Sequence, residues 1–129
     1  MYWDATRPPA QEPEFVTETG RLRPGVPIVH ARGTLDRTTV GELRRAVGLC
    51  LATSPWAVVV DLTALSELQP GALPGLVDVA RRARCGHVGL HLVTAGGAAD
   101  DVLGAVPPCD RFTVHRSVPA AEQALGGRS

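Results

Sequence analysis

Lysine is absent from this 129-residue sequence, and aromatic residues are scarce. All 13 basic residues are arginines, 13 acidic residues balance them, and the formal net charge is zero. Such a balance argues against a nucleic-acid-binding protein, which normally carries a basic excess on one face. It also removes long-range attraction to acidic membranes. Because aromatic residues make up only 4% of the chain, the core must be built mainly from valine, leucine and alanine.

Cysteine is rare as well, which bears on disulfides and on metals. The three cysteines are Cys50, Cys85 and Cys109. An odd number at wide spacing does not fit a disulfide framework. The candidate metal ligands are Cys85, His87, His91, Cys109 and His115. Their spacings match no common zinc pattern, so we predict no metal site and no cofactor, and we expect the thiols to be small buried side chains.

Segments that direct a chain to or through a membrane are missing too. Met1–Asp4 lacks the basic stretch and apolar run with which a signal peptide begins. No apolar segment approaches the length of a membrane span. We therefore expect a cytoplasmic protein without membrane insertion.

Hydrophobic periodicity predicts alternating strands and helices. The expected strands are Glu14–Thr19, Val26–Ala31, Ala57–Leu62, Val88–Thr94 and Arg111–His115. The expected helices are Thr39–Ala52, Pro70–Arg84, Ala98–Leu103 and Ser117–Leu125. Residues 1–13, rich in proline and polar groups, and the glycine-rich residues 126–129 are expected to be a flexible arm and tail. This leaves one domain over residues 14–125.

Local patterns add detail to these elements. Val58–Val60 is apolar without alternation, which is typical of a strand covered on both faces, and its flanking helices imply a parallel sheet. Thr39 and Glu42 have the spacing of a capping box at the start of the first helix. The second helix can begin at Pro70 or at Pro74, because proline suits the first helical turn.

Three short motifs lie in the loops and strand ends. They are Gly33-Thr34-Leu35-Asp36, Val58-Val59-Val60-Asp61-Leu62-Thr63 and Asp110-Arg111-Phe112. In their order and spacing they resemble the STAS domain of anti-sigma factor antagonists, over residues 14–125. The resemblance implies an α/β fold with a mixed sheet of about five strands and helices packed mainly on one side.

The chain departs from that family at one functional position. In the family, the loop after the Asp-Leu strand normally reads Asp-Ser-Ser-Gly, and an anti-sigma kinase phosphorylates a serine there. The corresponding stretch in this sequence is Gln69-Pro70-Gly71-Ala72, which has no hydroxyl. Pro70 and Gly71 therefore mark a degenerate phosphorylation site. Ser66 and Thr63 are the nearest hydroxyls and remain alternative acceptors.

The resemblance implies a regulatory protein that binds an anti-sigma factor or a related serine-kinase switch protein, and so frees a sigma factor. The expected partner-binding residues are Gly33, Thr34, Leu35, Asp36, Ser66, Glu67, Leu68, Gln69, Pro70, Gly71, Ala72, Leu73 and Leu76. Exposed leucines beside a helix start would suit a partner's apolar groove. The alternative is that most of these residues pack the second helix on the sheet.

Other functions remain open. The domain could be a STAS subunit of a transporter-associated or stressosome-like complex. In a different class, it could bind a small molecule or nucleotide through loops near Asp61 and Gly96. We predict no enzyme, because Ser54, Ser66 and Ser117 lie in contexts typical of loops and caps rather than beside a general base. A monomer and a homodimer are both compatible with the sequence.

Overall fold

The computed structural model describes residues 15–106 and 113–126. Within these residues the strands are β1 (Phe15–Arg23), β2 (Val26–Leu35), β3 (Ala57–Leu68), β4 (Gly89–Val93) and β5 (Thr113–His115). The helices are α1 (Val40–Leu51), η3 (Pro70–Ala72, a 3₁₀ turn), α2 (Leu73–Cys85), α3 (Ala98–Leu103) and α4 (Val118–Leu125). The expected arm (1–13), Cys109, the Asp110–Phe112 motif and residues 127–129 of the expected tail lie outside the described residues.

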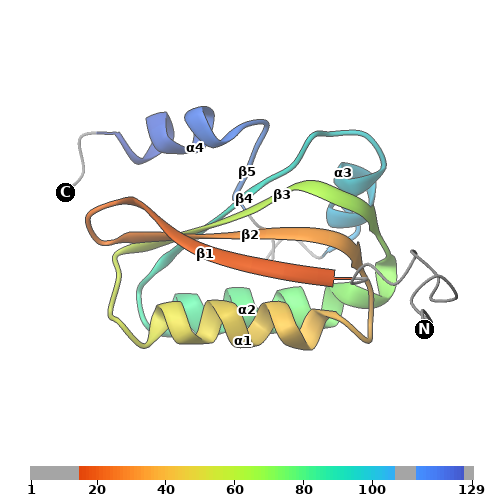
Figure 1. Cartoon of the computed structure of the whole chain (residues 1–129), viewed down its shortest axis with the longest axis horizontal. Coiled ribbons are helices and arrows are strands. Elements are labelled where there is room, and N and C mark those ends of the chain that lie inside the picture. Colours follow the sequence, from red (N-terminus) through yellow and green to blue (C-terminus); the bar gives the residue numbers. More distant parts are fainter. Residues whose placement is uncertain (1–14, 107–112, 127–129) are drawn as a thin grey trace, which may run out of the picture.

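The strands form one mixed sheet in the order β1-β2-β3-β4-β5 (Figure 1). β1 pairs with β2 antiparallel, and the pairs β2–β3, β3–β4 and β4–β5 are parallel. Parallel neighbours need crossover connections, which α1, α2 and α3 provide. The predicted α/β class and mixed sheet are confirmed.

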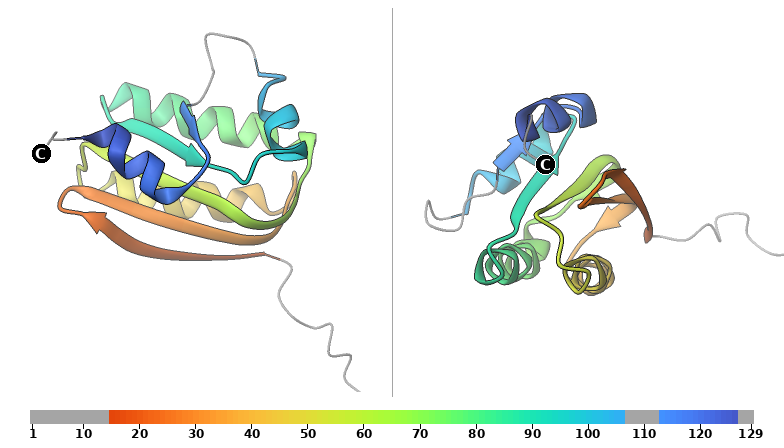
Figure 2. Two further views of the ribbon diagram at one scale, coloured as in Figure 1. Left: turned by 90° about the horizontal axis from the view of Figure 1, so that it is seen from above. Right: turned by 90° about the vertical axis from the view of Figure 1, so that its left-hand side faces the viewer.

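One face of the sheet is covered by α1 and α2, which run side by side beneath it (Figures 1 and 2). Val58, Val60 and Leu62 of β3 point to this face and join the main apolar core with buried residues of both helices. The apolar stripe on α1 supplies Val40, Leu43, Val47 and Cys50 to that core. The expectation that Cys50 is a core residue is confirmed, whereas Cys85 is exposed.

Among the described residues, α4 covers part of the opposite face (Figure 2). Ala121 and Leu125 of α4 pack on a second apolar cluster that includes Val59 and Val93. Val59 thus faces away from Val58 and Val60, and β3 is buried on both faces as its unbroken valine run predicts. The helices lie mainly on one side, as expected.

Three strands are longer than predicted. Gly20 continues β1, Gly33 continues β2, and Ser66 continues β3. The parallel pairing of β2 and β3 extends as far as Leu35 opposite Leu68, and irregularities near Arg32 and Gly33 adjust the register. Glycine and polar residues read as breaks in the sequence, but strand pairing satisfies their backbone groups here.

The start of α1 also differs from the prediction. Thr39 makes no capping bond to the helix through its side chain, so the predicted capping box is wrong. Asp36 stabilises this turn instead, since its Oδ1 accepts the backbone N–H groups of Thr38 (2.8 Å) and Thr39 (2.9 Å). The Thr39 hydroxyl donates to the Thr34 carbonyl oxygen at 2.8 Å. At the other end of the chain, the predicted cap is confirmed, because Ser117 Oγ accepts the N–H of Ala120.

Candidate protein-binding surface

The two segments that the sequence marks for partner binding lie together. β2 and β3 are parallel neighbours, so their carboxyl ends meet at one edge of the sheet. The Gln69 N–H donates to the Leu35 carbonyl oxygen at 2.9 Å, which joins the segment after β3 to the end of β2. A Cβ placed on Gly71 would lie 3.3 Å from the Cβ of Arg37. The loop before α1 and the turn before α2 therefore form one continuous surface.

The start of α2 uses both candidate prolines. Gln69 is extended, Pro70 begins the 3₁₀ turn η3, and Pro74 lies in the first turn of α2 proper. Proline lacks an N–H, and the first turn of a helix has no intrahelical partner for that group. The two possible starts in the sequence are thus two consecutive helical segments.

Several of the predicted binding residues are buried. They are Leu35, Leu68, Ala72 and Leu76, all members of the main core. Leu73 is half-buried and packs against the same core. The expectation of exposed leucines beside the helix start is therefore wrong for Leu35, Leu68 and Leu76, whose side chains lie in the core. These residues support the surface from below.

The accessible members of the predicted set form what we call the α2-start surface. Ser66, Glu67, Pro70 and Gly71 are exposed, and Gly33, Thr34, Asp36, Gln69 and Leu73 are partly exposed. The hydrogen bond from the Thr39 backbone lowers the pKa of Asp36. Desolvation opposes it, but further hydrogen bonds from the Thr38 backbone and the Thr39 side chain and the charge of Arg37 keep the pKa below its usual value. Asp36 is thus a fixed anion beside the exposed Arg37.

The two alternative phosphate acceptors lie in β3, not at the helix start. Ser66 is exposed near the end of the strand. Thr63 donates its hydroxyl to Asp61 Oδ1 at 2.7 Å, and its backbone N–H donates to the same oxygen at 3.0 Å. Neither hydroxyl lies in the turn η3 before α2.

A second polar group, which the sequence did not reveal, lies on the open part of the sheet's second face. His30 Nδ1 is 2.8 Å from Asp61 Oδ2, and the strand register places Glu18 opposite His30. Burial raises the pKa of Asp61, but hydrogen bonds from Thr63 and from His30 outweigh it, so the pKa lies below the usual value. His30 and Asp61 are 31 residues apart, and only the register of β2 against β3 brings them together.

The loop near Gly96 is held by contacts of Thr94, Asp100 and Arg116. Thr94 is fully buried and donates its hydroxyl to Asp100 Oδ1 at 2.7 Å, while Arg116 pairs with the other oxygen of Asp100. Hydrogen bonding from Thr94, together with Arg116, lowers the pKa of Asp100 against a smaller effect of burial. These contacts tie β4, α3 and the end of β5 together, so Asp100 has a structural role.

The described residues also bear on metal binding and on membrane insertion. Among residues 15–106 and 113–126, no three His, Cys, Asp or Glu side chains come close enough together to hold a metal ion. In the same ranges, no helix is sufficiently long and apolar to span a bilayer.

The fold and the α2-start surface define a small α/β domain that presents loops at the carboxyl ends of two parallel strands. The chain belongs to the STAS domain family, whose model matches residues 21–121. No relative was found among curated protein sequences. The resemblance seen in the sequence is therefore confirmed at the level of the family.

Solved structures with the same fold are anti-sigma factor antagonists and a related protein. An anti-sigma factor antagonist from Mycobacterium paratuberculosis is 24% identical, with a TM-score of 0.72 over 86% of this chain and 93% of that one. A variant of RsbS from Moorella thermoacetica is 14% identical, with a TM-score of 0.69 over 84% and 93%. The phosphorylated Bacillus cell fate determinant SpoIIAA is 10% identical, with a TM-score of 0.63 over 84% and 99%. At these identities the likeness establishes the fold.

Proposed function

We propose that this domain is a non-enzymatic regulator that binds an anti-sigma factor or a related switch kinase through the α2-start surface. Binding is not controlled by phosphorylation at the position before α2. One observation carries the proposal: a chain of the STAS family brings Gly33–Asp36 and Ser66–Leu73 together, yet has Pro70 and Gly71 where the family's acceptor serine is expected.

The physical reason for phosphorylation-independent binding is the lack of a phosphate acceptor before α2. A phosphate adds close to two negative charges and can block a tight protein contact. Residues 67–72, Glu-Leu-Gln-Pro-Gly-Ala, offer no hydroxyl to accept it. A surface of this kind stays competent to bind, with Asp36 fixed as an anion and Glu67 exposed beside the turn.

Binding can be measured by isothermal titration with the ATP-binding anti-sigma factors of the same organism. Glu67→Arg should weaken binding about tenfold, because it reverses a charge at the surface. Glu122→Arg, an exposed position on α4, is the matched control and should bind like the wild type. Equal affinities for the two variants, or binding only to transporter subunits, would overturn the assignment of this surface and partner.

Control by phosphorylation is tested separately, with a cognate kinase, ATP and mass spectrometry. The wild type should remain unmodified at residues 69–72. Gly71→Ser places a hydroxyl on an exposed turn, with its Cβ 3.3 Å from Arg37, and should gain one phosphate. Phosphate found on Ser66 or Thr63 of the wild type would contradict phosphorylation-independent binding while leaving the binding surface in place.

A further inference from the structure

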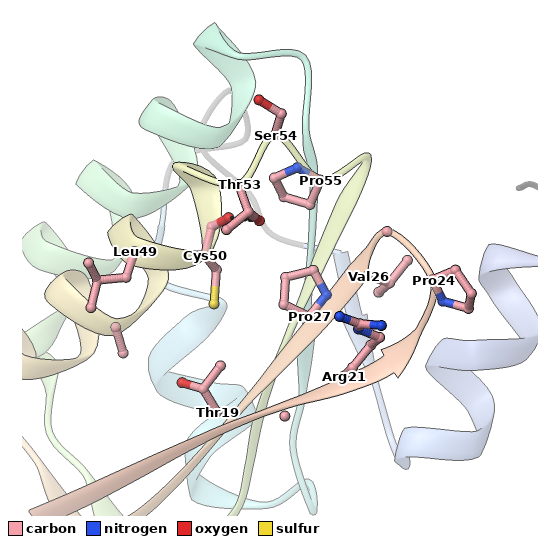
Figure 3. Close-up of a pocket in the computed structure, with 13 residues that line it drawn as sticks. Thr19, Arg21, Pro24, Val26, Pro27, Leu49, Cys50, Thr53, Ser54 and Pro55 are labelled. Carbon is pink, nitrogen blue, oxygen red and sulfur yellow. Dashed lines mark hydrogen bonds between the residues drawn. The ribbon is translucent and has the colours of Figure 1, made fainter.

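An open groove lies at the end of the domain away from the α2-start surface. It is bounded by the β1–β2 hairpin, the last turns of α1 and the loop that leads to β3 (Figure 3). Its volume is about 890 Å³. Thirteen of the described residues line it, among them Thr19, Arg21, Ala46, Leu49, Cys50 and Ser54.

The floor of this groove is apolar. Ala46 and Cys50 of α1 line it and are buried members of the main apolar core. Leu49 lies on the rim with 66% of its surface exposed, more than any other large apolar side chain in the described ranges. Burial raises the pKa of the Cys50 thiol, so the floor carries no thiolate at neutral pH. The groove thus offers an uncharged apolar surface that no element of residues 15–106 or 113–126 covers.

A single cation adjoins this surface. Arg21 is the one charged residue among the thirteen that line the groove, and no acidic side chain lines it. Within the described residues, no carboxylate forms an ion pair with Arg21. Thr19 and Ser54 add hydroxyl groups, while the Thr53 hydroxyl already donates to the Cys50 carbonyl oxygen at 2.7 Å. Arginine is the side chain best suited to grip a carboxylate through two parallel hydrogen bonds.

We propose that this groove binds a small monocarboxylate with an aliphatic or aromatic body. The carboxylate pairs with Arg21, and the apolar body lies on Ala46, Leu49 and Cys50. Its volume falls within the range of about 300–1,000 Å³ that is usual for small-molecule sites. Size therefore favours a small molecule as the occupant.

Octanoate is a suitable probe, followed by ¹H–¹⁵N NMR titration of the whole chain, with octylammonium as the probe of opposite charge. Octanoate should give saturable shifts centred on Thr19, Leu49 and Ser54, and octylammonium should bind at least tenfold more weakly. Arg21→Gln should reduce octanoate affinity about tenfold and abolish the preference for the carboxylate. Arg32→Gln, at an exposed arginine of β2 that does not line the groove, should leave both affinities unchanged.

The apolar part of the site has its own variant. Leu49→Gln should weaken octanoate binding several-fold without unfolding the domain, because Leu49 is mostly exposed. Absence of saturable binding to the wild type, equal octanoate affinity in wild type and Arg21→Gln, or shifts centred elsewhere would overturn the proposal. Shifts of the same residues that depend on protein concentration alone would also overturn it, since they would identify the groove as a contact between two copies. None of these outcomes depends on partner binding at the α2-start surface.

Discussion

The two faces of the sheet differ in what covers them and in the chemistry they carry. The face under α1 and α2 is apolar throughout its core, from Phe15 at one edge to Leu92 of β4. The face under α4 has a smaller apolar cluster, and beyond it lie His30 with Asp61 and His91 with His115. The first face should therefore carry most of the stability, and the second should carry the response to pH.

The sharpest test of this difference compares two buried leucines. Leu76 of α2 is 2% exposed in the main core, and Leu125 at the end of α4 is 6% exposed on the second face. Leu76→Ala should reduce the free energy of unfolding by about 2–5 kcal/mol through lost burial and a residual cavity. Leu125→Ala should lose about 2 kcal/mol or less, because a short terminal helix can open locally instead of leaving a cavity.

Urea unfolding followed by circular dichroism measures both values, with Leu49→Ala as the exposed control. That control should change stability by no more than about 0.5 kcal/mol. Equal losses for Leu76→Ala and Leu125→Ala would mean that the two faces contribute alike, and the comparison would fail.

A smaller effect is expected where the two helices of the first face touch. A Cβ on Gly75 of α2 would lie 2.7 and 2.8 Å from the two methyl carbons of Val40 on α1, so the helices approach too closely for a side chain. Gly75→Ala should destabilise the domain by about 1–3 kcal/mol through overpacking, despite the better helix propensity of alanine. Gly41→Ala is the matched control, since its Cβ would meet nothing within 4 Å.

Thermal unfolding of the two glycine variants checks this. Gly41→Ala should stabilise the domain by up to about 1 kcal/mol through helix propensity alone. If Gly75→Ala is also stabilising, α1 and α2 do not pack as closely as the structure shows. Tight helix packing would then not distinguish the first face from the second.

The sequence predicted the fold well where burial is periodic or continuous. The valines at positions 58–60 identified a strand covered on both faces, and the apolar stripe at Val40, Leu43, Val47 and Cys50 identified α1. These patterns follow directly from helix and strand geometry, so a local reading is sufficient. The STAS motifs then supplied the topology.

The candidate site was predicted only in outline. The segments around Asp36 and Gln69 were identified, but the burial of Leu35 and Leu76 depends on how far β3 extends and on the turn η3, which no local pattern specifies. The His30–Asp61 pair depends on strand register across 31 residues, and the groove beside Leu49 depends on the placement of a hairpin against α1. Both are long-range consequences of the fold.

The smallest effect is expected on the second face, in mild acid. His91 and His115 lie with Nδ1 and Nε2 3.1 Å apart, and burial, together with the neighbouring His115, lowers the pKa of His91. The folded state therefore disfavours a proton that the unfolded chain accepts below about pH 6.5. The stabilisation that comes from keeping His91 unprotonated is complete above that pH. It is lost as the pH falls toward the folded-state pKa of His91, by at most about 1.4 kcal/mol per pH unit for one proton.

Urea unfolding at pH 7.5, 6.5 and 5.5 should show this decline in the wild type and in the control His87→Asn, but not in His91→Asn. This pH range is separate from the one in which Asp61 acts. Because the pKa of Asp61 is lowered, its contribution to stability is lost only in stronger acid, below the usual aspartate value of 3.8. A decline of equal slope in His91→Asn would show that the pH response does not originate at this pair, and the second face would lose its assigned role.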